Sequence, residues 1–161
     1  MSFEQYQDKI ARRSGPASKQ QLGASAMVLT VTAASLLGAQ REQSADAKGI
    51  VAKVGLILRQ CAIICSNRGI QLSSLVEVAQ EVASKEDVNT DAADVVVRSV
   101  VVTNAVMHQL AKIEKLNNED LQSMIIRVLS ASCSVVHDYM STMEEAAELD
   151  ISNLNKSRRS K

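Results

Sequence analysis

The amino-acid sequence predicts an all-α protein, a single-domain helical bundle of five or six helices. Hydrophobic residues recur at spacings of three and four along most of the chain, which is the period of one helix face. The 161 residues include one proline and six glycines, whereas all-β folds use many turns that depend on these residues. Aromatic residues make up 2% of the chain, so the core is built from small and aliphatic side chains that let helices approach closely.

The first expected helix is short and covers residues 3–13. Phe3, Tyr6 and Ile10 fall on one face of it. The following segment, SGPAS (14–18), contains the proline of the chain next to a glycine. Because this pairing breaks helices, we expect the first helix to end there.

A second helix is expected over residues 18–44 and opens a bundle that extends to residue 149. No residue between Lys19 and Arg41 carries a charge. The stretch AMVLTVTAASLL (26–37) contains β-branched residues, so a strand and a membrane span are alternatives to a helix. The uncharged run is too long for an ordinary strand, and polar side chains interrupt it as a span. A helix that is apolar nearly all round is typical of a buried helix.

Two further helices are expected over residues 45–68 and 72–86. A hydrophobic stripe at helical spacing marks each one, and Gly69 follows the first as a C-terminal cap. Cys61 and Cys65 are four residues apart, which places them on one face of a helix. Because no histidine lies nearby in the sequence to complete a zinc site, the pattern favours buried thiols that act as small hydrophobes.

Residues 91–115 and 119–149 complete the bundle as a fifth helix and a long sixth helix. The run DVVVRSVVV (94–102) leaves a strand as an alternative for residues 91–103. The hydrophobic pattern continues beyond this run at helical spacing, which favours the helix. From residue 150 to residue 161 we expect a polar, basic tail that frays.

The chain also contains a faint internal similarity. The run 27–44, followed by the hydrophobic stripe at 50–68, resembles the run 95–112, followed by the stripe at 121–140. This similarity suggests two helix pairs of similar length.

Charge and cysteine content argue against several classes of protein. The 18 basic and 18 acidic residues balance, and basic residues cluster only in KSRRSK (156–161). Nucleic-acid-binding proteins usually show a basic excess and aromatic side chains for stacking, so we do not expect nucleic acid as the partner. Three cysteines without paired spacing give no disulfide framework. This favours a reduced, intracellular setting, so we expect the protein in the cytoplasm, or within a viral particle if its role is structural.

Acidic side chains offer a candidate metal site. Glu77 and Glu81 lie four residues apart in one expected helix, and Asp91 and Asp94 lie three apart at the start of the next. If these two helices form a hairpin, their carboxylates supply the hard oxygens that Mg²⁺ prefers. The alternative is that the aspartates stabilise a helix start and the glutamates lie on a solvated face.

Three segments resemble MazG-like all-α nucleoside triphosphate pyrophosphohydrolases: FEQYQDKIARRSGP (3–16), NRGIQLSSLVEVAQ (67–80) and ISNLNKSRRSK (151–161). The resemblance implies a dimer or tetramer and Mg²⁺-dependent cleavage of a nucleoside triphosphate to its monophosphate and pyrophosphate. Such enzymes carry an E-x-x-E pair in one helix and an E-x-x-D pair in a later helix. This chain has Thr30 and Ala33 at the first pair and KVGL (53–56) at the second, so no metal ligand carries over.

We therefore expect a non-catalytic helical protein without a cofactor, which acts by self-association or by binding a protein partner, as a structural or assembly component does. A homo-oligomer is expected, because small side chains and an uncharged helix suit helix packing between chains. A membrane partner is not expected. The alternative is a divergent Mg²⁺-dependent pyrophosphohydrolase that uses the four acidic residues Glu77, Glu81, Asp91 and Asp94.

Overall fold

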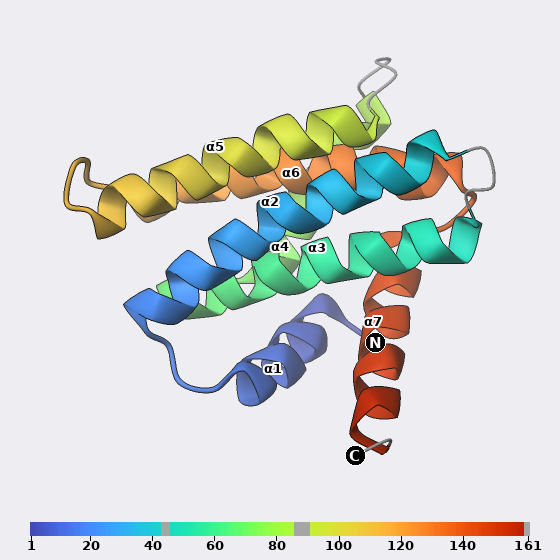
Figure 1. The fold of residues 1–161 in the computed structure, drawn as a ribbon, viewed down its shortest axis with the longest axis horizontal. Helices are drawn as coiled ribbons and strands as arrows, with labels where there is room; N and C mark the ends of the chain where they lie inside the picture. Colours follow the sequence, from blue (N-terminus) through green and yellow to red (C-terminus); the bar gives the residue numbers. More distant parts are fainter. Residues whose placement is uncertain (43–45, 86–90, 160–161) are drawn as a thin grey trace.

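The computed structural model describes residues 1–42, 46–85 and 91–159. These residues form seven helices and no strand (Figure 1): α1 (Phe3–Ser14), α2 (Lys19–Arg41), α3 (Ala47–Arg68), α4 (Leu72–Lys85), α5 (Ala92–Leu110), α6 (Asn118–Asp138) and α7 (Met143–Arg159). The all-α prediction is confirmed. The two stretches for which a strand was an alternative lie in α2 and α5 and are helical.

The described residues contain seven helices, one or two more than the expected six or five. The helix expected over 119–149 is two helices, α6 and α7, separated by residues 139–142. Met140 adopts a left-handed φ of 55°, and the Ser141 N–H donates to the Val136 carbonyl oxygen at 3.0 Å. This is the Schellman arrangement that ends a helix, usually with glycine in the left-handed position.

The start of α7 is a capping box. The Thr142 hydroxyl oxygen accepts from the Glu145 N–H at 3.2 Å, and the Glu145 carboxylate accepts from the Thr142 N–H at 3.3 Å. From there α7 continues to Arg159. The tail that was expected to fray from residue 150 is instead helical as far as Arg159, and residues 160–161 lie outside the described residues. The fifth helix, in contrast, ends at Leu110, earlier than expected.

The helices pack as two copies of one three-helix arrangement. Exchanging α2, α3 and α4 for α5, α6 and α7 leaves the set of helix contacts among the described residues unchanged, apart from those of α1. The third helix of each half packs on the second helix of the other half, α4 on α6 and α7 on α3. Such reciprocity is the pattern of two-fold symmetry. Figure 1 shows α2 and α5 antiparallel and side by side, with α5 along the upper edge of the view.

Equivalent positions in the two halves share their structural roles. Asp46 and Asn117 are the N-caps of α3 and α6, and Gly69 and Met140 are the left-handed residues after them, at the same separation along the chain. At that separation, the buried positions of α4 (72, 75, 76 and 79) match buried positions of α7 (143, 146, 147 and 150). Likewise, buried positions of α2 (22, 26, 29 and 33) match buried positions of α5 (95, 99, 102 and 106) at one constant separation. Two helix pairs of similar length, as the sequence suggested, are present in the fold, but equivalent residues of α2 and α5 lie 73 positions apart rather than the 68 of the sequence similarity.

α1 has no counterpart in the other half and is held by a buried polar network. Asp150 of α7 is 1% exposed. Its carboxylate accepts from Arg59 of α3, at 2.5 Å from Nη2 and 3.1 Å from Nε, and from the Tyr6 hydroxyl of α1 at 3.0 Å. Burial and the Asp150 carboxylate raise the pKa of Tyr6 well above its ordinary value, so the hydroxyl stays protonated and donates. The network joins α1, α3 and α7.

Candidate functional site

Two of the four predicted metal ligands cap a helix. Asp91 is the N-cap of α5, and its Oδ1 accepts from the Ala93 N–H at 2.8 Å and from the Asp94 N–H at 3.3 Å. The Asp94 carboxylate accepts in return from the Asp91 N–H at 3.0 Å. These reciprocal bonds form a capping box, which stabilises a helix start without any ligand.

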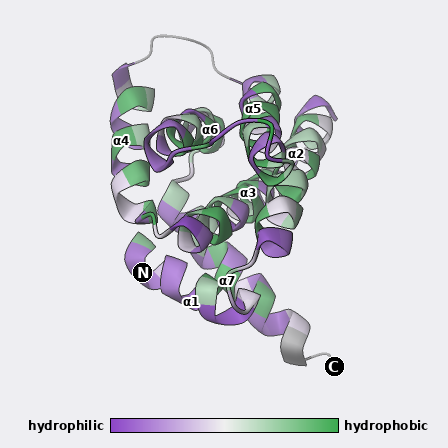
Figure 2. Ribbon diagram, turned by 90° about the vertical axis from the view of Figure 1, so that its left-hand side faces the viewer, coloured by the Kyte–Doolittle hydropathy of each residue, from purple (hydrophilic) through white to green (hydrophobic). Residues whose placement is uncertain are grey.

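The other two predicted ligands lie on the exposed face of α4. Glu77 and Glu81 are both exposed, and Glu81 forms an ion pair with Lys85, whose hydrogen bond lowers the pKa of that carboxyl. α4 and α5 do not pack on each other in the described part of the chain, because α6 lies between them (Figure 2). Within the same residues, no group of three or more His, Cys, Asp and Glu side chains could hold a metal ion. The four carboxylates are thus not brought together.

The cysteines are buried in the helices and carry no disulfide. Cys61 and Cys65 are 0% exposed on α3, and Cys133 is 8% exposed on α6. Burial raises the pKa of Cys65 and, together with the negative charge of Glu144, that of Cys133 to about 12. At neutral pH these thiols are protonated and pack as small hydrophobic groups.

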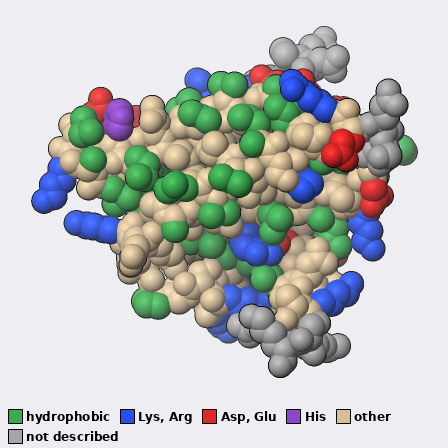
Figure 3. All heavy atoms as spheres, viewed as in Figure 1, with side chains coloured by type: hydrophobic (Ala, Val, Ile, Leu, Met, Phe, Trp, Pro, Cys, Tyr) green, Lys and Arg blue, Asp and Glu red, His purple; other side chains and the backbone are tan. Residues whose placement is uncertain are grey.

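The outer surfaces of α2 and α5 carry exposed hydrophobic side chains, which Figure 3 shows gathered over these two helices. Each of these side chains is 40% to 68% exposed. We call them the apolar face: Met27, Val28 and Val31 of α2, and Val97, Val100, Val101 and Met107 of α5. From its uncharged sequence this part of α2 was expected to be buried, and that expectation is wrong for the outer side of the helix.

The apolar face exists because both helices are hydrophobic on two sides. The inner side of α2 supplies core residues such as Leu29 and Ala33, both 0% exposed. Residues on the opposite side would be polar in an ordinary surface helix, but here the uncharged run continues around it. Helical periodicity could have identified this second hydrophobic side, since Val28 and Val31 lie three positions apart and off the core stripe.

Charged side chains are kept away from the middle of the apolar face. On α2 the nearest charged residues are Lys19 and Arg41, at the two ends of the helix. On α5, Arg98 is the one charged residue between Asp94 and His108. Its Nη1 donates to the Arg127 carbonyl oxygen at 2.9 Å and to the Ser130 hydroxyl at 3.0 Å, both on α6. The guanidinium therefore extends toward α6 and leaves the α2 side of α5 uncharged.

Two helices in the described residues, α2 and α3, are long and apolar enough by length and composition to cross a membrane. Within the fold, 44% of the most apolar window of α2 and 61% of that of α3 are buried. The core of a helical bundle accounts for the apolar character of α3. For α2, the exposed part includes Met27, Val28 and Val31 of the apolar face.

No family model, no curated protein and no solved structure matches this chain. The relationship to MazG-like enzymes stays a prediction from the three quoted segments. The apolar face is the surface feature that the geometry singles out.

Proposed function

We propose that the protein acts by self-association, with a second copy of the chain covering the apolar face. The observation that carries the proposal is a row of seven hydrophobic side chains, each at least 40% exposed, on two adjacent helices. Together they expose several hundred Å², close to the upper range for the largest apolar patch of a typical monomer. A stable interface of standard size buries about 800 Å² on each partner, so the proposed dimer interface includes residues that border the face.

The occupant is a second copy because the face suits contact with itself. In a two-fold dimer, the same patch of both subunits meets, so any charge near the axis meets a like charge. The middle of the apolar face has none. The face also repeats internally: Met27 and Val28 of α2 correspond to Val100 and Val101 of α5, at the separation that relates the buried positions of these helices. In the proposed dimer, the α2–α5 pair of one copy packs on the α2–α5 pair of the other, and small side chains allow these four helices to approach closely.

Light scattering after size exclusion tests this proposal. The wild-type chain, with a mass of 17.4 kDa, is expected to elute with twice that mass. Val31→Glu and Val97→Glu each place a carboxylate in the face, where burial without a partner weakens association by roughly 100-fold or more. Both positions are more than 60% exposed in the monomer, so the variants are expected to fold.

A matched control is available on another helix. Val78 of α4 is 43% exposed and lies outside the apolar face, so Val78→Glu introduces the same charge and leaves the dimer intact. A wild-type chain that is monomeric at several hundred micromolar contradicts the proposal. A vesicle flotation assay gives a second outcome that contradicts it. If the wild-type chain is monomeric and floats with phospholipid vesicles, and Val31→Glu does not float, the face binds a lipid surface and not a second copy.

A further inference from the structure

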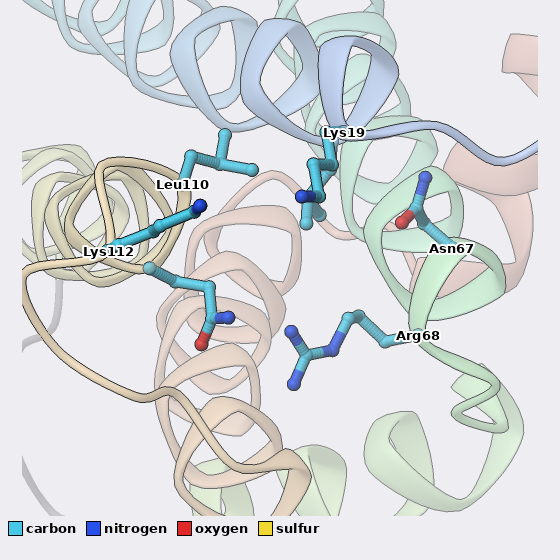
Figure 4. Close-up of a pocket in the computed structure, with 7 residues that line it drawn as sticks. Lys19, Asn67, Arg68, Leu110 and Lys112 are labelled. Carbon is cyan, nitrogen blue, oxygen red and sulfur yellow. The ribbon is translucent and has the colours of Figure 1, made fainter.

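A pocket lies at the end of the bundle where α2 starts and where α3 and α5 end. Its volume is about 290 Å³, near the lower limit for small-molecule sites. Lys19, Arg68 and Lys112 bring three cationic side chains to it. Figure 4 shows these three side chains extending from different helix ends toward the same space. The remaining lining residues are Leu22, Asn67, Gln109 and Leu110, and we call the site the cationic pocket.

The lining contains no acidic residue that could neutralise these charges. In the described residues, Lys19 and Lys112 have no hydrogen-bond or ion-pair partner for their ammonium groups. Arg68 is held in place, since its Nε donates to Asn118 Oδ1 at 3.0 Å and its Nη2 to the Leu116 carbonyl oxygen at 2.7 Å. Three converging positive charges repel one another, and a bound anion would relieve that repulsion.

The internal repeat shows that the fold does not need these cations. At the opposite end of the bundle, Ala92 stands at the position equivalent to Lys19, and Tyr139 stands at the position equivalent to Arg68. Both ends are built from the same helix starts and ends. The equivalents of Lys19 and Arg68 are uncharged, so helix packing alone does not require a cation at these two positions.

Lys112 occupies a backbone position that favours glycine. Its φ is 58°, and the Ile113 N–H donates to the His108 carbonyl oxygen at 2.9 Å, so α5 ends in a Schellman arrangement with lysine at the left-handed position. Gly69 fills the same role at the end of α3 with a φ of 66°. A left-handed lysine costs conformational free energy that glycine does not. The lysine gives the pocket a charge that glycine would not supply.

We propose that the cationic pocket binds a small molecule through its phosphate groups. A guanidinium can donate two parallel hydrogen bonds to phosphate oxygens, and an ammonium acts as a compact point charge for them. Phosphate oxygens also carry the negative charge that the pocket lacks. This proposal is independent of self-association, because none of the pocket residues belongs to the apolar face.

Isothermal titration and thermal unfolding test the proposal with inorganic phosphate, pyrophosphate and ATP, each at an ionic strength matched with sodium chloride. At least one phosphate compound is expected to bind and to raise the Tm, since a ligand of the native state stabilises it. The compound that binds most tightly identifies the class: a single phosphate, a diphosphate or a nucleotide. Lys19→Gln and Lys112→Gln are each expected to weaken it about tenfold or more, because each removes a charge-assisted contact.

Lys112→Gly separates binding from stability. It relieves the left-handed backbone, so the Tm without ligand rises, while the response to the phosphate compound is lost. Met140→Gly is the matched control, because it relieves the same conformation at the end of α6 and keeps the full response. The proposal is overturned if no phosphate compound acts more strongly than sodium chloride, or if Lys112→Gly keeps the wild-type affinity. If Val31→Glu breaks the dimer and the variant still binds the phosphate compound, the apolar face and the cationic pocket are separate sites.

Discussion

Thr30 of α2 and Thr103 of α5 meet across the contact between the two helices, with 2.8 Å between their Oγ1 atoms. The two threonines are equivalent under the internal repeat, since they share the separation that relates the buried positions of α2 and α5. Their bond therefore marks the axis of the repeat. Met27 and Val28 lie close to one of them in sequence and Val100 and Val101 to the other, so the apolar face is built around this pair.

Thr103→Val is expected to lower the free energy of unfolding by about 1 to 2 kcal/mol, because the Thr103 hydroxyl bonds both Thr30 and the Ala26 carbonyl oxygen. Thr30→Val removes one bond and costs less. Urea unfolding of both variants measures the difference. Equal losses for the two variants would show that the bond to Ala26 contributes nothing.

Asp150→Ala is expected to cost about 3 kcal/mol or more, because it removes the partner of Arg59 and of the buried Tyr6 hydroxyl. Urea unfolding followed by circular dichroism measures the loss. Asp138, exposed at the end of α6, is the control, and Asp138→Ala is expected to stay within about 0.5 kcal/mol of wild type. A loss at Asp150 no larger than that at Asp138 would show that the network does not hold α1 and α7.

Stability is expected to fall as the pH rises from about 9 to about 12. An unfolded thiol loses its proton near pH 9.0, whereas in the fold the pKa of Cys65 and that of Cys133 are raised to about 12. The unfolded state therefore binds fewer protons in this window, and each thiol contributes a slope of about −1.4 kcal/mol per pH unit. Urea titrations between pH 8 and pH 11 measure how the free energy of unfolding changes with pH. Cys133→Ala is expected to reduce this slope by the contribution of one thiol. An unchanged slope would contradict the burial of Cys133.

Asp94→Ala is expected to lower the free energy of unfolding by about 1 kcal/mol, as the loss of a cap does. Because Glu77, Glu81, Asp91 and Asp94 do not converge, millimolar Mg²⁺ is expected to leave the Tm of the wild type and of the variant unchanged. A panel of nucleoside triphosphates with Mg²⁺ provides the second readout. Pyrophosphate release that disappears in Asp94→Ala would support the enzyme alternative and contradict this interpretation.

Local patterns in the sequence predicted most of the helices. Hydrophobic spacing located α1 to α5, and Asp91 was recognised at a helix start, because caps and faces depend on residues three or four positions apart. The break between α6 and α7 was missed, since Met140 stands where glycine usually signals a helix end. The Thr-x-x-Glu box at residues 142–145 was the signal that could have revealed it.

Long-range relations were beyond sequence patterns. Asp150 reads as part of a polar tail, and only the fold brings it to Arg59, 91 positions away. The cationic pocket likewise combines Lys19, Arg68 and Lys112 from three helix ends. The apolar face could be predicted only in part. Its hydrophobic residues are evident from the sequence, but their exposure depends on which side of α2 packs against the core.

Sedimentation equilibrium over a range of protein concentrations tests self-association through the apolar face most directly. We expect twice the 17.4 kDa mass of one chain for the wild type, and the mass of one chain for the double variant Val31→Glu/Val97→Glu at the same concentrations. A single-chain mass for the wild type at every concentration, or an unchanged mass for the double variant, would contradict this expectation.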